Sequence, residues 1–398
     1  IARTEGATLA IVGWDVSHPE VMNWDDWLAQ GDPSDPSLDV KPRANLLYTS
    51  GTTGRPKGTE LPPTMFAGGS TMGEHLEGMK LNRFAEYGTH LVVGPMYHTG
   101  PLNGMRLLVR GVPMVILAKF DAEQTLDAIA TYKTETSVMV PTHFVRLLAL
   151  PEDVKAKYDV SSMKLVAHTG ASCPVDVKRS MIEWFGPIIN ETYASSEAGM
   201  ITSISSAEAL QRPGSAGRPV LDAKVRILNE AGDPLPTGEI GLIYVRQPVY
   251  PDFTYRHNDA ARRAIERDGL ISLGDMGYLD EDGYLYLCDR ASDMVISGGV
   301  NIYPAEIEHR LLACPGVADC AVFGVPDPEF GERLHAVVEP LPGAAPTLVD
   351  MQAWLQAGLA AFKVPRSFDL APLPRDDSGK IAKRRLRDQY WQGQSRRV

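Results

Sequence analysis

The sequence contains few cysteines, and none of them is spaced for a metal site. Its four cysteines are Cys173, Cys288, Cys314 and Cys320. They form no CxxC pair and have no histidines at the spacing of zinc ligands. Thiols this few and this scattered are typical of a reduced protein without a disulfide framework. We therefore expect a cytoplasmic protein whose cysteines lie mostly in the core.

Long apolar runs are also missing. Stretches such as LVVGPMYH and VPMVILAK have the length of strands and are too short to span a membrane. The first residues, IARTEGATLAIVGW, lack the basic flank and apolar core of a secretory signal. The sequence thus predicts no transmembrane segment. Because it starts with Ile1 and not with methionine, it also suggests a fragment.

An excess of positive charge is the third absence. The chain carries 50 acidic and 39 basic residues and a formal net charge of −11. Proteins that bind nucleic acid through its backbone usually show the opposite balance, so no nucleic-acid partner is expected. An anionic ligand would have to be bound by local donors, since the overall field repels it.

Apolar runs alternate with amphipathic segments from residue 45 to about residue 195. Strands are predicted at 45–50, 90–95, 112–117, 136–141 and 164–170, and helices at 103–111, 121–133, 142–150 and 174–186. Asp121 can cap its helix, and Pro174 suits a first helical turn. Such alternation predicts an α/β fold with a largely parallel, covered sheet.

The pattern changes near Gly217, where strands separated by Gly, Pro and Asp turns indicate a small β-subdomain. After Arg290 a compact α+β pattern follows. We expect a large N-terminal domain (1–290) of mixed, mostly parallel sheets, with the β-subdomain at about 217–290. A small, mobile α+β domain (291–398) should follow, with the boundary at about 289–293.

The most informative stretch is YTSGTTGRPKG, from Tyr48 to Gly58. Its glycines allow the backbone to approach a ligand, its hydroxyls and Lys57 can donate, and its successive N–H groups can bind an anion. It is not the P-loop of nucleotide triphosphatases, because proline precedes Lys57 and glycine follows it. The alternative is an ordinary surface turn, which rarely combines so many donors. A phosphate-binding loop is the favoured interpretation.

This stretch resembles the phosphate-binding signature of adenylate-forming enzymes: acyl-CoA synthetases, peptide-synthetase adenylation domains and luciferases. Further stretches resemble other motifs of this superfamily in the same order. They are PMYHTG (95–100), HTGASCP (168–174), ETYASSEAG (191–199), GEIGLIYV (238–245), the run 272–308 and PRDDSGKIAKRRLR (374–387). The resemblance covers nearly the whole chain from Asn45 onward. NIYPAEIE and the tail LRDQYW look most like bacterial fatty-acid or steroid-acid CoA ligases.

The resemblance implies an ATP-dependent acid–CoA ligase. In such enzymes a carboxylate attacks the α-phosphate of ATP, pyrophosphate leaves, and CoA then displaces AMP. The implied ligands are ATP, Mg²⁺, CoA and a small-molecule carboxylic acid. Methionine, glycine and small residues around 95–105 and 193–203 are consistent with a hydrophobic acid.

The resemblance also assigns nucleotide-binding residues. These are Thr49, Ser50, Gly51, Thr52, Thr53, Gly54, Lys57, Gly170, Ala171, Ser172, Tyr193, Ser196, Asp275 and Arg290. Glu197 is the expected magnesium ligand, with Thr52 beside it, because Mg²⁺ takes one or two protein oxygens together with phosphate oxygens. Asp275 would accept from the ribose hydroxyls, with Arg290 as a neighbouring donor. By local sequence alone Asp275 would be a turn residue.

Lys380 is the expected catalytic lysine, bridging the substrate carboxylate and the α-phosphate. Taken alone, it would only open a solvated basic face, 380–387. His98 is expected to orient the acyl carboxylate, and Gly298 and Gly299 to let pantetheine pass. The small domain would turn about Ser292 between the two half-reactions.

Some positions depart from the pattern of these enzymes. Ala194 and Ser292 stand where glycine and an aspartate or lysine are usual, and SLGD replaces a longer run before Asp275. Relatives also carry more chain than the 44 residues before Asn45. A non-catalytic nucleotide-binding remnant and an enzyme that loads a carrier protein remain alternatives. A homodimer and a separate N-terminal fragment are the partner chains left open.

Overall fold

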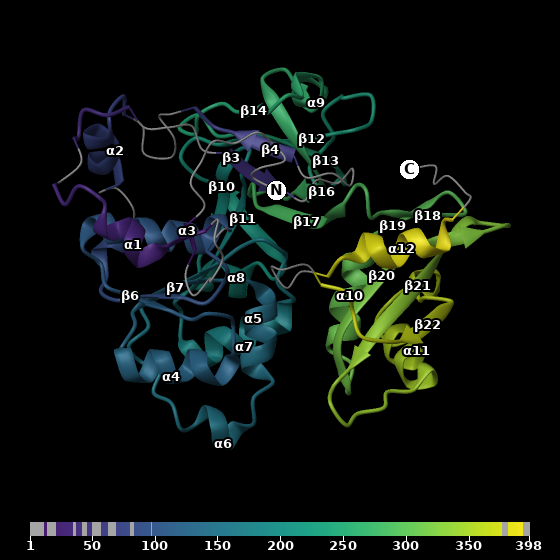
Figure 1. The fold of residues 1–398 in the computed structure, drawn as a ribbon. Coiled ribbons are helices and arrows are strands. Elements are labelled where there is room, and N and C mark those ends of the chain that lie inside the picture. The colour runs from purple at the N-terminus through teal and green to yellow at the C-terminus, as the bar shows by residue number, and fades with distance from the viewer. Residues whose placement is uncertain are drawn as a thin grey trace.

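The computed structural model describes most of the chain. The described residues are 12–13, 21–34, 37–41, 46–49, 57–62, 69–79, 83–96, 98–375 and 381–392. Figure 1 shows a large body built on one long sheet, with a smaller body beside it formed by the C-terminal elements. The described residues contain no helix long and apolar enough to cross a membrane.

One half of the large sheet is parallel. Its strands, in spatial order, are β9 (Ile189–Ser195), β8 (Leu165–His168), β7 (Thr136–Met139), β5 (His90–Val92) and β6 (Met114–Ile116). All neighbouring pairs in this half are parallel. The strand–helix alternation predicted for this part of the chain is therefore confirmed.

The other half continues the same sheet with antiparallel strands. These are β10 (Gly199–Ile204), β11 (Ser215–Pro219), β17 (Leu285–Arg290), β16 (Leu270–Leu279), β13 (Gly241–Arg246) and β12 (Lys224–Leu228), with β15 (Glu266–Arg267) paired to β16. The strands expected as a separate subdomain are thus continuous with the parallel half. The join is β10, which pairs antiparallel with β9 after the turn at 196–198.

Helices cover the parallel half, as Figure 1 shows. They are α3 (Thr99–Met105) with the 3₁₀ helix η3 (Arg106–Arg110), α4 (Ala122–Tyr132), α5 (Pro141–Leu148), α6 (Glu152–Lys155) and α7 (Val175–Phe185). Asp121 caps α4 as predicted, since its Oδ1 accepts from Gln124 N at 2.9 Å. Pro174 is the residue just before α7 and not within its first turn. Leu91, Ile129 and Phe144 belong to the core between sheet and helices.

The strand predicted at 45–50 lies outside the large sheet. β3 (Leu46–Thr49) pairs antiparallel with β4 (Lys57–Glu60), which pairs with β14 (Thr254–Tyr255). Tyr48 is 69% exposed, so β3 is not the buried strand that its apolar residues suggested. The apolar residues of this segment fit a buried strand as well as a hairpin, and it is the pairing with residues 57–60 that makes it a hairpin.

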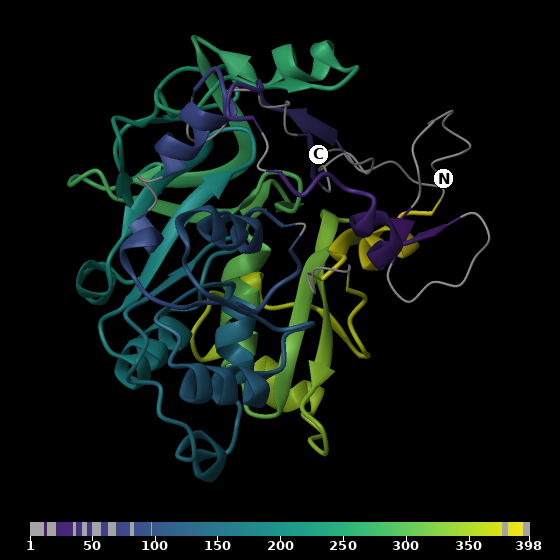
Figure 2. The same cartoon turned by 60° about the vertical axis from the view of Figure 1, so that its left-hand side comes forward.

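The remaining elements of the large body are short. They are β1 (Val12–Gly13), β2 (Met22–Asn23), α1 (Trp24–Ala29), α2 (Met72–Gly78), η2 (Arg83–Glu86), α8 (Ser206–Gln211) and α9 (Asp259–Ala264). Figure 1 shows α1 and α2 on the side of the large body away from α12, and Figure 2 gives the view turned by 60°.

The smaller body is a sheet with helices on both faces. Its strands are β19 (Val300–Ile302), β18 (Val295–Ser297), β21 (Gly331–Pro340), β20 (Val317–Asp327) and β22 (Ser367–Leu370). Its helices are α10 (Pro304–Leu312), α11 (Leu348–Gln356), η4 (Ala361–Lys363) and α12 (Lys383–Tyr390). Val322 packs towards α10 and α11, and Phe323 lies in the opposite cluster with Leu386 of α12. This alternation along β20 confirms the predicted α+β pattern.

Buried histidines predict that the fold loses stability in mild acid. Burial lowers the pKa of His90, His143 and His309 from 6.5 to about 4 in each case. Since the unfolded state binds more protons below pH 6.5, stability is complete above that pH and falls as the pH drops towards 4. Each histidine should contribute about 2 kcal/mol of this loss between pH 7 and pH 5. Denaturant titrations at these two pH values measure it.

The variant His143→Gln should reduce that pH-dependent loss by about 2 kcal/mol, the share of one histidine. His257, which is exposed, provides the control variant His257→Gln. An equal pH dependence in the wild type and His143→Gln would contradict the assignment.

Candidate functional site

The centre of the candidate site is the carboxylate of Asp275 on β16. Its Oδ2 accepts a hydrogen bond from the Tyr193 hydroxyl at 2.6 Å, and its Oδ1 lies 3.6 Å from Nε of Arg290. Arg290 is directly opposite Asp275 in the register of β16 and β17. The structure thus brings together three residues that the sequence predicted separately as nucleotide contacts.

The electrostatics of this group balance burial against positive charge. Burial raises the pKa of Asp275, while Arg290 and the Tyr193 hydroxyl act in the opposite direction. The pKa of Tyr193 lies well above its usual range because of burial and the neighbouring carboxylate. Arg290 keeps 55% of its side chain exposed. The arrangement can therefore accept hydrogen bonds from neutral hydroxyls at Asp275 and donate to an anion through Arg290.

Glu197 lies in the tight turn between β9 and β10. The hydroxyl of Ser195 accepts from the backbone N–H groups of Glu197 (3.2 Å) and Ala198 (3.0 Å), which fixes the turn. Gly199 closes it with φ of +66°, and a Cβ there would lie 2.5 Å from the ring of Tyr250. The same tyrosine donates to the carbonyl of Ser196 at 3.2 Å. Ser195 thus fixes the turn from within, and Tyr250 fixes it from a distant part of the chain.

Tyr255 joins Glu197 to the hairpin of β3 and β4. Its hydroxyl donates to Oε1 of Glu197 at 3.1 Å, and the Lys57 ammonium lies 5.1 Å from its ring centroid. The sequence motifs do not include Tyr250 or Tyr255. The signal that could have identified them is the aromatic run VYPDFTY in an otherwise polar stretch.

Lys57 and Thr49 face each other in the register of β3 and β4. The segment between them contains most of the predicted phosphate loop. Ser50, Gly51, Thr52, Thr53 and Gly54 lie outside the described residues, as does the side chain of Thr49. What the structure describes is the base of the loop, which Tyr255 connects to Glu197.

Gly170, Ala171 and Ser172 follow β8 at the carboxyl end of the parallel strands. Gly170 has φ of +88°, which favours glycine, and β8 pairs with β9, the strand that carries Tyr193. His98 follows β5 at the same edge and precedes α3, where its carbonyl accepts from Leu102 N at 2.9 Å. Ligands of open α/β sheets bind at this edge.

Two predicted groups belong to the smaller body. Gly298 and Gly299, with φ of +58° and +82°, form the tight turn between β18 and β19, and Gly298 N donates to the carbonyl of Phe330 at 2.9 Å. A turn of this type favours glycine whether or not a ligand binds there. Lys380 lies outside the described residues; Arg375 and Ile381, on either side of its loop, form a β-bridge.

The described residues contain no group of three or more His, Cys, Asp or Glu that could hold a metal ion. Glu197 is a single carboxylate whose Oε1 accepts from Tyr255. A lone carboxylate suits Mg²⁺ that is bound mainly by phosphate oxygens and water. Glu197 therefore fits a magnesium ion that arrives with a nucleotide, and it does not fit a structural metal.

A buried ion pair that the sequence gave no reason to expect lies behind the site. Lys178 of α7 contacts Glu191 of β9, and both side chains are less than a tenth exposed. His168, at the end of β8, places Nε2 3.5 Å from the same carboxylate. Burial raises the pKa of Glu191 and holds the pKa of His168 far below its usual value. The pair ties the helix α7 to the strand that carries Tyr193.

Comparisons with known proteins agree with this geometry. Residues 3–250 match the AMP-binding enzymes, and residues 306–380 match the AMP-binding enzyme C-terminal domain. A feruloyl-CoA synthase from an Amycolatopsis species is 34% identical over 91% of this chain and 73% of its own length. A long-chain-fatty-acid–CoA ligase from Bacillus subtilis is 34% identical over 88% of this chain and 62% of its own. The ATP-bound structure of MatB from Rhodopseudomonas palustris matches with a TM-score of 0.73 and 33% identity, over 87% of this chain and 67% of that one.

The buried ion pair predicts an asymmetry between single and double variants. Lys178→Met leaves Glu191 buried without its partner and should cost about 3 kcal/mol of unfolding free energy. Lys178→Met combined with Glu191→Gln should recover most of that loss, because no unpaired charge stays buried. Denaturant unfolding measures both.

Lys133→Met is the matched control, since Lys133 pairs with Asp159 where both side chains are exposed. It should cost less than about 1 kcal/mol. A double variant no more stable than Lys178→Met would rule out the unpaired charge as the cause.

Proposed function

Because the chain belongs to the AMP-binding enzyme family of adenylate-forming acid–CoA ligases, we propose that it activates a hydrophobic carboxylic acid. The acid would become an acyl-adenylate with release of pyrophosphate, and CoA would then take the acyl group. The observation that carries this proposal is the grouping of Tyr193, Asp275 and Arg290. In this group Asp275 can accept from sugar hydroxyls, and Arg290 provides a cation for phosphate.

In the first half-reaction, a carboxylate oxygen of the acid bonds to the α-phosphorus while the bond to pyrophosphate breaks. Lys57 and the loop that starts at Thr49 would bind the phosphates, and Asp275 the ribose. Gly170, Ala171 and Ser172 would lie along the adenine. Mg²⁺ beside Glu197 would neutralise charge on the phosphate oxygens. Lys380 would bring its ammonium to the oxygens that change charge, which stabilises the transition state.

In the second half-reaction, the CoA sulfur bonds to the acyl carbon, the bond to AMP breaks, and the thiol proton is lost to solvent or a base. We propose that residues 291–398 act as a mobile domain that turns about Ser292 between the two steps. Gly298 and Gly299, in a turn without side chains, would then allow pantetheine to pass close to the backbone.

A hydrophobic acid is supported by two observations. His98 and Gly170 lie at the same edge of the sheet, and α3, which follows His98, begins Thr–Gly–Pro–Leu. The relatives named above are a feruloyl-CoA synthase and a long-chain-fatty-acid–CoA ligase. Aromatic propenoic acids and fatty acids are therefore the first two classes to test.

The deciding experiment is a panel of aromatic and aliphatic acids with ATP and Mg²⁺, monitored by pyrophosphate release and by mass spectrometry of acyl-adenylates. At least one hydrophobic acid should give an adenylate, and added CoA should convert it to a thioester. Transfer to an acyl carrier protein in place of CoA would favour the carrier-loading alternative. ATP binding without pyrophosphate release from any acid would favour a non-catalytic protein.

Replacement of the proposed catalytic lysine tests its role directly. Lys380→Ala should slow adenylate formation by about a hundredfold or more, since it removes a charge aimed at the reacting oxygens. ATP affinity, measured by calorimetry, should stay within about threefold, because the loop near Lys57 and Asp275 provide most of the binding. A variant as fast as the wild type would remove Lys380 from the mechanism.

The hydroxyl of Tyr255 offers a subtler test, because it holds Glu197 in place. Tyr255→Phe should raise the Mg²⁺ concentration needed for half-maximal pyrophosphate release by about tenfold. The rate at saturating Mg²⁺ should change much less. Tyr132→Phe, at an exposed position, is the control; an unchanged Mg²⁺ requirement in Tyr255→Phe would contradict the assignment of Glu197.

A further inference from the structure

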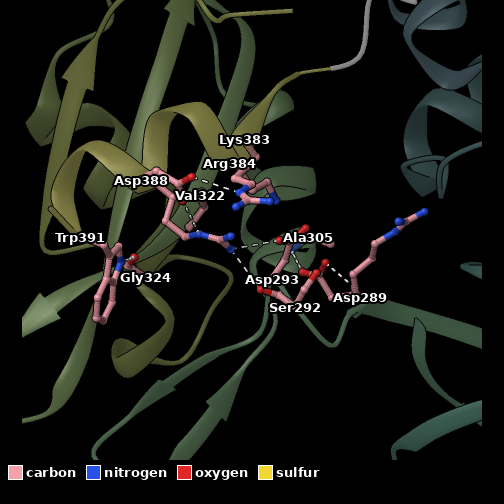
Figure 3. Close-up of polar contacts among 12 residues, drawn as sticks. Asp289, Ser292, Asp293, Ala305, Val322, Gly324, Lys383, Arg384, Asp388 and Trp391 are labelled. Atoms are coloured by element: carbon pink, nitrogen blue, oxygen red, sulfur yellow. Dashed lines mark hydrogen bonds and ion pairs between the residues drawn. The ribbon is translucent and has the colours of Figure 1, made fainter. Parts of the chain in front are cut away.

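The C-terminal helix α12 is fixed to the smaller sheet along its length. Lys383 pairs with Glu308 of α10 at 2.8 Å, and the same carboxylate accepts from Val322 N of β20 at 2.6 Å. Beyond the other end of the helix, Trp391 Nε1 donates to the carbonyl of Gly324 at 2.9 Å. Figure 3 shows Trp391 beside Gly324, and Lys383 at the other end of the helix. The helix therefore moves with the smaller body.

From this helix one side chain reaches back to the joint segment, residues 289–293, which links the two bodies. Arg387 Nη1 donates to the carbonyl of Ser292 at 3.1 Å and lies 3.4 Å from Oδ1 of Asp293. Ser292 and Asp293 lie just below α12 in Figure 3. The Arg387 side chain is 13% exposed, so the contact is largely shielded from water.

This contact limits which bonds can serve as a pivot. The Ser292 carbonyl lies in the planar peptide between residues 292 and 293, and so moves rigidly with Asp293 N. A turn about φ or ψ of Ser292 carries both Arg387 acceptors along with the smaller body. A turn about φ of Asp293 would separate them. The contact with Arg387 is thus compatible with rotation only at Ser292 or before it.

Unlike the contact of Arg387, the hydrogen bond of Asp289 does cross the pivot. Asp289 belongs to β17 and is held in the large sheet opposite Met276. Its Oδ2 accepts from the N–H of Ala305, at the start of α10 in the smaller body, at 2.8 Å. Rotation at Ser292 must break this hydrogen bond, whereas it leaves the contacts of Arg387 intact.

We propose that Arg387 is a positioning residue that makes the 292–293 peptide part of the smaller body, and that Asp289 is a latch formed only in the orientation of the two bodies seen here. The proposal rests on the function proposed above, which requires the smaller body to turn. Arg387 then serves both half-reactions equally. Asp289 biases the equilibrium towards one of them.

The two roles predict different kinetic signatures in single-turnover assays of each half-reaction: pyrophosphate release, and thioester formation from isolated adenylate and CoA. Arg387→Ala should slow both by a common factor of about three to ten and leave their ratio within about twofold. Asp289→Ala should shift that ratio by about tenfold, the effect of losing one hydrogen bond to a charged group. Asp289→Asn, which keeps an acceptor oxygen, should restore most of the wild-type ratio.

Arg384→Ala is the matched control for Arg387. Arg384 lies on the same helix but pairs only with the exposed Asp388 within the contacts described, at 3.1 Å. It should leave both half-reactions unchanged. A shifted ratio in Arg387→Ala, an unshifted ratio in Asp289→Ala, or losses in Arg384→Ala equal to those of Arg387→Ala would overturn the proposal.

Hydrogen exchange tests the role of Arg387 without turnover. The amides of Asp293 and Met294 donate to the carbonyl of Arg290 at 2.9 and 3.1 Å, across the proposed pivot. Arg387→Ala should speed their exchange by about tenfold in the substrate-free protein, and Arg384→Ala should not. Unchanged exchange would overturn the role of Arg387 even in an active enzyme. A wild type that releases pyrophosphate with no acid would instead overturn the proposed function.

Discussion

The hydrogen bond from Tyr193 to Asp275 is the constraint on which the site depends. Tyr193 lies on β9 and Asp275 on β16, and three strands separate them in the order of the large sheet. In a flat sheet four strand spacings of about 4.8 Å would hold the two backbones roughly 19 Å apart. Two side chains cannot span that distance. The sheet must therefore curl between its parallel and antiparallel halves, and this curl places the turn with Glu197, the carboxyl ends of β8 and β9, and Asp275 around one space.

Much of this fold follows from local sequence, because its elements are set by short-range pattern and capping. Asp121 begins α4 as predicted, and the alternation of β7, β8 and β9 with α5 and α7 specifies the parallel half. What could not be predicted depends on pairing over long separations. Leu46 and Leu47 suit a buried parallel strand as well as the hairpin that they form. No local sequence feature of the strands after Gly217 indicates that β10 joins them to the parallel half.

The site was predictable to the extent that its residues are carried by motifs. Asp275, Arg290, Tyr193 and Glu197 were predicted as site residues from motifs, and the structure places the first three in contact. Their supporting residues were not identified, because a tyrosine that holds a carboxylate looks in sequence like any core aromatic. Tyr255 is separated from Glu197 by more than fifty residues, and Lys178 acts on Glu191 from a different element. The roles of Lys380 and of residues 50–54 stay predictions, because these residues lie outside the described part of the chain.

The end of β17 shows how the site and the smaller body are connected. Successive residues of a strand point to opposite faces. Arg290 therefore faces Asp275, while its neighbour Asp289 faces the start of α10. A nucleotide bound as proposed at Asp275 and Arg290 would contact β17 on one face, while the smaller body contacts the neighbouring Asp289 on the other. A ligand can shift the orientation of the smaller body only by binding one orientation more tightly than the other. Arg290 and Asp289 are adjacent on one strand. A ligand that displaces the backbone of Arg290 would therefore also displace the Asp289 carboxylate, which is the acceptor of the latch.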